Sequence, residues 1–262
     1  FEIKVMDKAT NQNTTVDTGT SVVPYEFTVD ATDPTGSASI GTNVWDKLLE
    51  ALTFGLYTNE KFDVTASANA KTSPIKIEYY KVANDYATTP LTWAQLDAVT
   101  DWTLVVDNGE NEVKDLSVLT VENDEQFVVY LKISNYAGGY TYISTDGAIV
   151  DTTNAAIELT PSAPAADNGD PDVYGYYNDD VTVSIKVTDA APYSGIKTVE
   201  YWVTADGVET QRETRFNFTK ESPKFNELVS SWEDNIVIEA EKNNSCNVVL
   251  NVKVTDNAGN EI

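Results

Sequence analysis

The chain has 262 residues, of which 41% are apolar and 23% are charged, as in ordinary folded domains and unlike disordered segments. Its 42 acidic and 17 basic side chains give a net charge of −25, which repels nucleic acid and anionic membranes. Histidine is absent and Cys246 is the sole cysteine, which excludes an internal disulfide, a metal site of thiolates or imidazoles, and Ser-His-Asp or Cys-His catalysis.

The first residues repeat a pattern that occurs again much later in the chain. Residues 3–11 align with residues 252–260, and residues 16–18 repeat the Val-Asp-Thr of residues 150–152. We therefore predict that residues 1–19 are the tail strand of a preceding module, and that the chain is cut from a longer array. No apolar run approaches the ~20 residues of a membrane span, so we expect no membrane insertion.

Residues 43–54 have the apolar spacing of a short helix. Trp45, Leu48, Leu49 and Leu52 stand at positions i, i+3, i+4 and i+7, and Asn43 can cap the first turn. We predict a short helix that covers an end or an edge of the first module. A helix that binds a partner is the alternative.

Three segments that alternate apolar and polar side chains recur in the same order in both halves of the chain. Alternation of this kind is typical of strands with one buried face. The segments of the first half are residues 62–68, 73–80 and 127–133, and their counterparts are residues 181–187, 194–202 and 248–254.

A pair of helix caps extends this repeat. Thr92 and Gln95 have the spacing of a capping box, and Ser222 is followed by a proline suited to the first helical position. A tryptophan follows ten residues after each cap, at Trp102 and Trp232. We therefore predict two short helical turns, and two tryptophans at equivalent core positions.

The spacing between the paired segments, about 120 to 130 residues, suits one β-sandwich. Residues 153–171 hold three prolines among small and acidic residues, as is common in a linker. We predict an all-β protein of two tandem immunoglobulin-like β-sandwich modules, residues 1–153 and 154–262, with short helices in module one.

The repeated strings resemble the tandem immunoglobulin-like repeats of very large cell-wall proteins of gut Gram-positive bacteria. The resemblance covers most of the chain and rests on residues 43–45, 53–55, 77–80, 127–133 and 142–147 of the first half, and on residues 194–197, 200–202 and 254–260 of the second. In that family such modules serve as stalks, adhesins, appendages of carbohydrate-active enzymes or immunoglobulin-binding superantigens.

The resemblance implies a location at the bacterial cell surface or cell wall and a non-catalytic role. We expect a monomeric segment of a longer array that attaches to a host protein, with immunoglobulin variable domains as one class of partner. The alternatives are a structural spacer and an accessory module of a carbohydrate-active enzyme. We expect no nucleic-acid partner, no cofactor and no enzymatic activity.

Two groups of residues are candidates for binding. Tyr136, Tyr140 and Tyr193 lie in or near predicted turns, where tyrosine offers contact area at low entropic cost. Asp167, Asp170 and Asp172 gather carboxylates in the predicted linker, and Ca²⁺ prefers such ligands. Their spacing does not fit an EF-hand loop, so a solvated acidic linker is the favoured interpretation of the second group.

Overall fold

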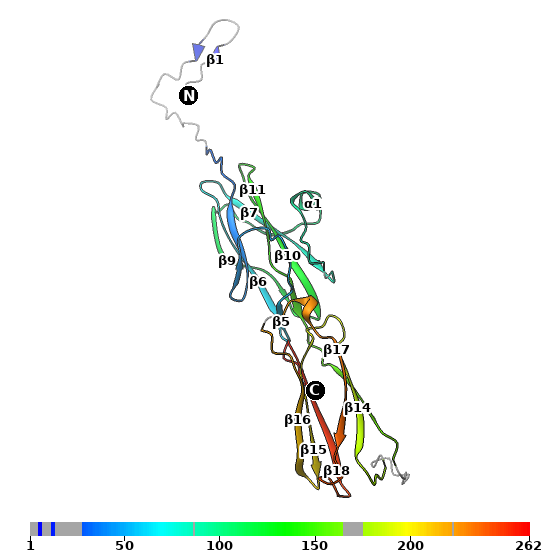
Figure 1. The fold of residues 1–262 in the computed structure, drawn as a ribbon. Helices are drawn as coiled ribbons and strands as arrows, with labels where there is room; N and C mark the ends of the chain where they lie inside the picture. The colour runs from blue at the N-terminus through cyan, green and yellow to red at the C-terminus, as the bar shows by residue number, and fades with distance from the viewer. Residues whose placement is uncertain (1–4, 7–11, 14–27, 86, 165–174, 222) are drawn as a thin grey trace.

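The computed structural model describes residues 5–6, 12–13, 28–85, 87–164, 175–221 and 223–262. The described residues lie mainly in antiparallel β-sheets, which confirms the all-β prediction. Two groups of sheets follow one another along the long axis of the molecule (Figure 1). We call them the first sandwich (residues 28–151) and the second sandwich (residues 156–262).

The first sandwich pairs two sheets. One has the order β4-β3-β6-β9, with the bounds Asn43–Trp45, Thr35–Ile40, Phe62–Asn69 and Glu112–Val121. The other has the order β5-β12-β10-β7-β8, with the bounds Leu56–Thr58, Ala148–Val150, Glu125–Asn135, Ile75–Ala83 and Thr103–Asp107. β11 (Tyr140–Ser144) forms a hairpin with β10.

The core of the first sandwich comes from the alternation seen in the sequence. Val64 and Ala66 of β6 and Val129 and Leu131 of β10 are buried in one cluster between the sheets. β10 is also buried on its other face, where Val128 and Tyr130 pack with Leu52, Phe54 and Leu96 in a second cluster. The segment of residues 46–55 and the helix α1 (Trp93–Asp97) supply that outer cover.

The second sandwich has a sheet with the order β13-β14-β17 and a sheet with the order β16-β15-β18. The bounds are Ala156–Pro161, Val181–Thr188 and Ser231–Ile238 in the first sheet and Val208–Asn217, Ile196–Ala205 and Val248–Asp256 in the second. Val183, Ile185 and Val187 of β14 pack with Val199 and Val203 of β15 in a separate core.

Three strands of each sheet follow the same order in both sandwiches, and β4, β5, β11 and β12 are additions of the first. β3-β6-β9 corresponds to β13-β14-β17, and β8-β7-β10 corresponds to β16-β15-β18. The three pairs of segments that repeat in the sequence therefore occupy matching strands, namely β6 and β14, β7 and β15, and β10 and β18. The division into immunoglobulin-like modules at residues 153 and 154 stays a prediction.

The predicted helix at residues 43–54 is wrong. Asn43–Trp45 is strand β4, which pairs with β3, and residues 46–55 are not helical. The backbone amides form hydrogen bonds with residues distant in sequence and not within a helix. The amide of Leu49 donates to Ser144 Oγ at 3.0 Å, and the amide of Leu52 donates to the carbonyl of Thr88 at 2.8 Å. The leucine side chains still cover the outer face of β10, which an irregular segment can do as well as a helix.

The two predicted helical turns exist, but they are not equivalent. α1 begins after Thr92, whose capping box with Gln95 is present, and it lies between β7 and β8. The 3₁₀ turn η1 (Phe225–Glu227) lies between β16 and β17, and its N-cap residue is Lys224. Pro223 therefore precedes the turn and does not open it, contrary to the prediction, and Ser222 lies outside the described residues. Trp102 therefore precedes β8 whereas Trp232 lies within β17, so the prediction of equivalent positions is wrong.

Part of the predicted linker is a strand. Ala156–Pro161 forms β13, which pairs along its whole length with β14. Residues 165–171, with Asp167 and Asp170, and also Asp172, lie outside the described residues. At the start of the chain Val5–Met6 (β1) pairs with Gln12–Asn13 (β2), and the other residues of the predicted tail strand lie outside the described residues. None of the helices in the described part of the chain has the length and apolar character that a membrane crossing needs.

Candidate functional site

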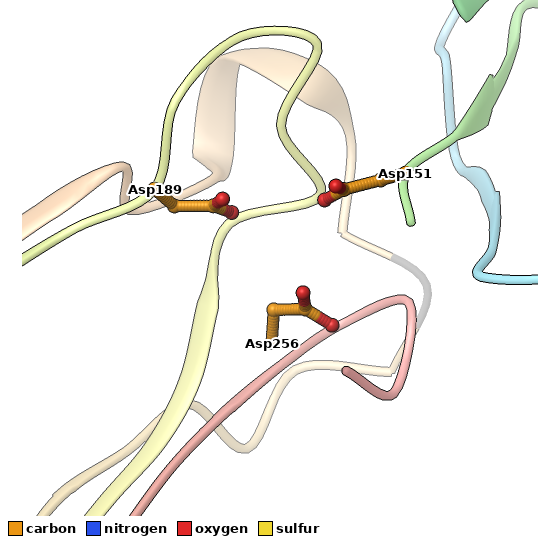
Figure 2. A group of neighbouring side chains, drawn as sticks. All are labelled: Asp151, Asp189 and Asp256. Carbon is orange, nitrogen blue, oxygen red and sulfur yellow. The ribbon is translucent and has the colours of Figure 1, made fainter. Parts of the chain in front are cut away.

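Three aspartates meet where the two sandwiches join. Asp151 follows β12 in the first sandwich, Asp189 follows β14 in the second, and Asp256 is the last residue of β18. We call them the junction aspartates. One carboxylate oxygen from each lies within 4.8 Å of the others, and the three side chains turn toward a common space (Figure 2).

The junction aspartates are buried. Asp151, Asp189 and Asp256 are 0%, 3% and 1% exposed. At an effective dielectric constant of about 20, two ionised carboxylates at this separation repel by about 3.5 kcal/mol. Burial of like charges therefore demands compensation by hydrogen bonds, by protonation or by a cation.

Asp151 connects the two sandwiches through hydrogen bonds. Its backbone amide donates to the carbonyl of Thr58 in the first sandwich at 2.9 Å. Its Oδ2 accepts from the amide of Ser194 in the second sandwich at 2.7 Å, and its carbonyl accepts from Asn260 Nδ2 at 2.8 Å. Its Oδ1 accepts from the amide and hydroxyl of Thr153 at 3.3 and 3.1 Å.

Asp256 is held by the turn that follows its own strand. Its Oδ1 accepts from the amides of Gly259 and Asn260 at 2.7 and 2.9 Å, and its Oδ2 accepts from Asn260 Nδ2 at 2.7 Å. Gly259 has φ of +97°, a conformation that glycine tolerates without strain and that brings its amide to the carboxylate. The Nδ2 group of Asn260 thus bridges Asp256 of one sandwich and Asp151 of the other.

Asp189 is the least compensated of the three. Its Oδ2 accepts from the amide of Gly195 at 2.7 Å, whereas its Oδ1 is buried and has no hydrogen-bond partner among the described residues. Burial, followed by the charge of Asp151, raises the pKa of Asp189 to about 7. Burial also raises the pKa of Asp256 above its ordinary value, against the effect of its hydrogen bonds to Asn260.

Further hydrophobic and hydrogen-bonded contacts join the two sandwiches. Phe225 of η1 packs against the outer cluster of the first sandwich, with its ring centroid 6.4 Å from that of Phe54, and its amide donates to the carbonyl of Thr53 at 3.0 Å. The hydroxyl of Tyr57 donates to the carbonyl of Pro223. The turn before β17 therefore docks on the first sandwich (Figure 1).

The three predicted tyrosines do not form one surface. Tyr193 is half-buried at the junction, where its ring stacks on Phe225 at a centroid distance of 5.2 Å. Tyr136 is 61% exposed in the turn between β10 and β11 and donates to Asp107. Tyr140, on β11, belongs to an aromatic cluster on the first sandwich.

We call this cluster, formed by Trp93, Tyr140 and Tyr142, the aromatic patch. Trp93 is 43% exposed, and its ring centroid lies 5.6 Å from that of Tyr140 and 4.8 Å from that of the buried Tyr142. Trp93 directly follows Thr92, the N-cap residue of α1, so the first turn of the helix places the Trp93 ring against the tyrosines of β11. The sequence predicts Tyr140 as a candidate for binding but does not indicate Trp93, because no local pattern shows that these two distant residues are in contact.

The junction aspartates were also missed, although the sequence holds a signal for them. The tripeptide Val-Thr-Asp occurs at residues 187–189 and again at residues 254–256, and a third aspartate follows the buried strand β12. Because each of these aspartates stands at the C-terminal end of a strand, the sequence could have predicted that aspartates gather at one end of a sandwich. The repeat does not indicate that Asp151 of the first sandwich lies close to the other two aspartates.

No protein-family model matches this chain, and no curated protein matches it.

Proposed function

We propose that this chain is a non-catalytic attachment segment of a bacterial surface protein, and that it binds a host protein through the aromatic patch. The observation that carries the proposal is the solvent-facing Trp93 ring beside Tyr140. Tryptophan and tyrosine are the residues that most often dominate the energy of protein interfaces. A partly exposed tryptophan supported by the half-buried ring of Tyr140 and the buried ring of Tyr142 offers such an anchor.

The aromatic patch is held in position before any partner arrives. Asp97 of α1 accepts hydrogen bonds from the hydroxyls of Tyr140 and Tyr142 at 3.1 and 2.9 Å. The ammonium of Lys132 lies 5.2 Å from the centre of the Tyr140 ring. A surface whose side chains are already ordered loses less entropy on binding, which favours affinity.

Immunoglobulin variable domains are the first class of host protein to test, because the resemblance of the repeats includes immunoglobulin-binding members. The test is a titration of the chain against antibody Fab fragments. We expect Trp93→Ala and Tyr140→Ala each to weaken binding by tenfold or more, which corresponds to about 1.4 kcal/mol. Tyr176→Ala is the matched control, since Tyr176 is 56% exposed and lies on the second sandwich.

Equal affinity for the Trp93→Ala variant and the parent chain would place the binding surface elsewhere. Absence of binding to Fab fragments and to a panel of mucosal host proteins would refute attachment and leave the second candidate.

That second candidate is a structural spacer that holds a distant domain away from the cell wall. The direct contacts at the junction favour it, because Phe225, Tyr57 and Asp151 each tie one sandwich to the other. A spacer needs a stiff joint and no ligand, so it predicts a folded chain that is silent toward host proteins.

A further inference from the structure

We propose that the junction aspartates Asp151, Asp189 and Asp256 bind a divalent cation, Ca²⁺, and that the ion joins the two sandwiches. This site is separate from the aromatic patch, and it does not depend on the attachment function.

Charge is the first argument. Three buried carboxylates converge on one space, and none of the described ion pairs gives any of them a lysine or arginine partner. Buried carboxylates are ordinarily paired with cations or coordinate metals. A divalent ion would neutralise most of this charge in one step.

The second argument is an acceptor that lacks a donor. Asp189 is 3% exposed, and its Oδ1 has no hydrogen-bond partner among the described residues. Figure 2 shows the Asp189 carboxylate turned toward Asp151 and Asp256. Most buried side-chain oxygens have a partner, so this atom points to a ligand that would supply one.

The donor set selects the ion. The three side chains offer only oxygen, whereas Zn²⁺ prefers nitrogen and sulfur ligands. The chain has no histidine, and its cysteine, Cys246, is exposed in a different part of the second sandwich. Oxygens bound to Ca²⁺ at about 2.3–2.6 Å stand up to about 5 Å apart across the ion, and the three oxygens already lie within 4.8 Å.

Mg²⁺ fits less well. It demands a near-ideal octahedron at about 2.0–2.1 Å and is seldom held by dedicated all-protein cages. Ca²⁺ accepts six to eight oxygens in a flexible geometry, so water and backbone carbonyls can complete a shell that begins with three carboxylates.

Binding would have a mechanical consequence. Asp151 comes from the first sandwich, whereas Asp189 and Asp256 come from the second. An ion between them would add a crosslink to the hydrogen bonds that Ser194 and Asn260 already make to Asp151. The stiffness of the joint would then depend on the Ca²⁺ concentration.

The test is calorimetric titration of Ca²⁺ into the chelator-treated chain, combined with thermal unfolding. For a dissociation constant of about 0.1 mM, as in extracellular Ca²⁺ modules, 10 mM Ca²⁺ would multiply the ratio of folded to unfolded protein by about 100. We expect one ion per chain and a raised melting temperature. Mg²⁺ at the same concentration should give a clearly smaller shift.

Two variants locate the site. Asp189→Asn should abolish the binding heat and the thermal shift while the metal-free variant remains folded, because it removes a charge that has no compensation. The triple variant Asp167→Asn, Asp170→Asn, Asp172→Asn should bind Ca²⁺ like the parent chain. Loss of binding in the triple variant alone, or no heat from the parent chain at 10 mM Ca²⁺, would overturn the proposal.

Discussion

The carboxylate Oδ2 of Asp151 accepts a hydrogen bond of 2.7 Å from the backbone amide of Ser194, across the boundary between the two sandwiches. Both residues are buried, at 0% exposed each. Replacing Asp151 by alanine would leave the Ser194 amide without this partner, and an unsatisfied buried donor costs about 1–3 kcal/mol. Opening the joint to water relieves that cost, so we expect Asp151→Ala to loosen the joint while both sandwiches stay folded.

Distances between two spin labels measure the loosening. Val44 and Val208 are exposed positions on the first and second sandwich and can carry the labels as cysteines, with Cys246→Ser as background. In chelator, Asp151→Ala should broaden the distance distribution. Asp206→Asn, an exposed aspartate of the second sandwich, is the control and should leave it unchanged. A distribution as narrow as that of the parent would show that other contacts hold the joint.

Metal-free protein should show a pH effect that Asp189 carries. The folded protein raises the pKa of Asp189 to about 7 from an unfolded value near 3.8, so the folded state binds the proton more tightly. The associated stability is fully present below about pH 4 and is lost as the pH rises through about 7.

The variant Asp189→Asn has no carboxyl group at this position, so it lacks this dependence of stability on pH. At pH 8 we expect metal-free Asp189→Asn to be more stable than the parent by on the order of 1–3 kcal/mol, and the advantage should shrink toward pH 5. Urea unfolding of both proteins at several pH values gives the difference. A difference that does not change between pH 5 and pH 8 would mean that Asp189 is not the titrating group.

Strand identity could be predicted from the sequence because alternation has a direct physical cause. Val183, Ile185 and Val187 alternate with polar residues since one face of β14 lies on the core and the other does not. The same pattern predicts the burial of Val129 and Leu131 in β10. It does not predict that Val128 and Tyr130 are also buried, because their cover comes from residues 46–55 and from α1, which are distant in sequence.

The candidate sites could not be predicted from the sequence, because they also depend on contacts between residues that are distant in sequence. The spacing i, i+3, i+4 at Trp45, Leu48 and Leu49 indicates that apolar side chains lie on one side of the segment. A helix and an irregular segment that covers a sheet are both compatible with this spacing. The junction aspartates depend on contact between two sandwiches, which no local pattern encodes. The helix caps led to a wrong prediction for a different reason: the two helical turns have similar sequence spacing but lie between different pairs of strands.

Phe225 should contribute to the joint more than to the sandwich that contains it. Its half-buried ring lies against Phe54 and Tyr193, with centroid distances of 6.4 and 5.2 Å. We expect Phe225→Ala to cost about 2 kcal/mol in stability and to broaden the spin-label distances. Phe216→Ala is the matched control: its half-buried ring contacts Trp232 within the second sandwich, so it should lower stability and leave the distances unchanged.

Trp102 and Trp232 should respond differently to the same substitution. The Trp102 ring stacks on Tyr142 at 5.6 Å, but its indole N–H is buried without an acceptor among the described residues.

Trp102→Phe removes that unsatisfied donor, whose burial costs about 1–3 kcal/mol, and keeps an aromatic ring, so its stability should lie within about 1 kcal/mol of the parent. Trp102→Ala also loses the stacking and should cost about 2–4 kcal/mol. At Trp232, which packs on Phe216 inside the second core, phenylalanine removes no buried unpaired donor and should cost more than it does at Trp102. Urea unfolding of the variants provides the comparison, and a large loss of stability for Trp102→Phe would show that its N–H has an acceptor in solution.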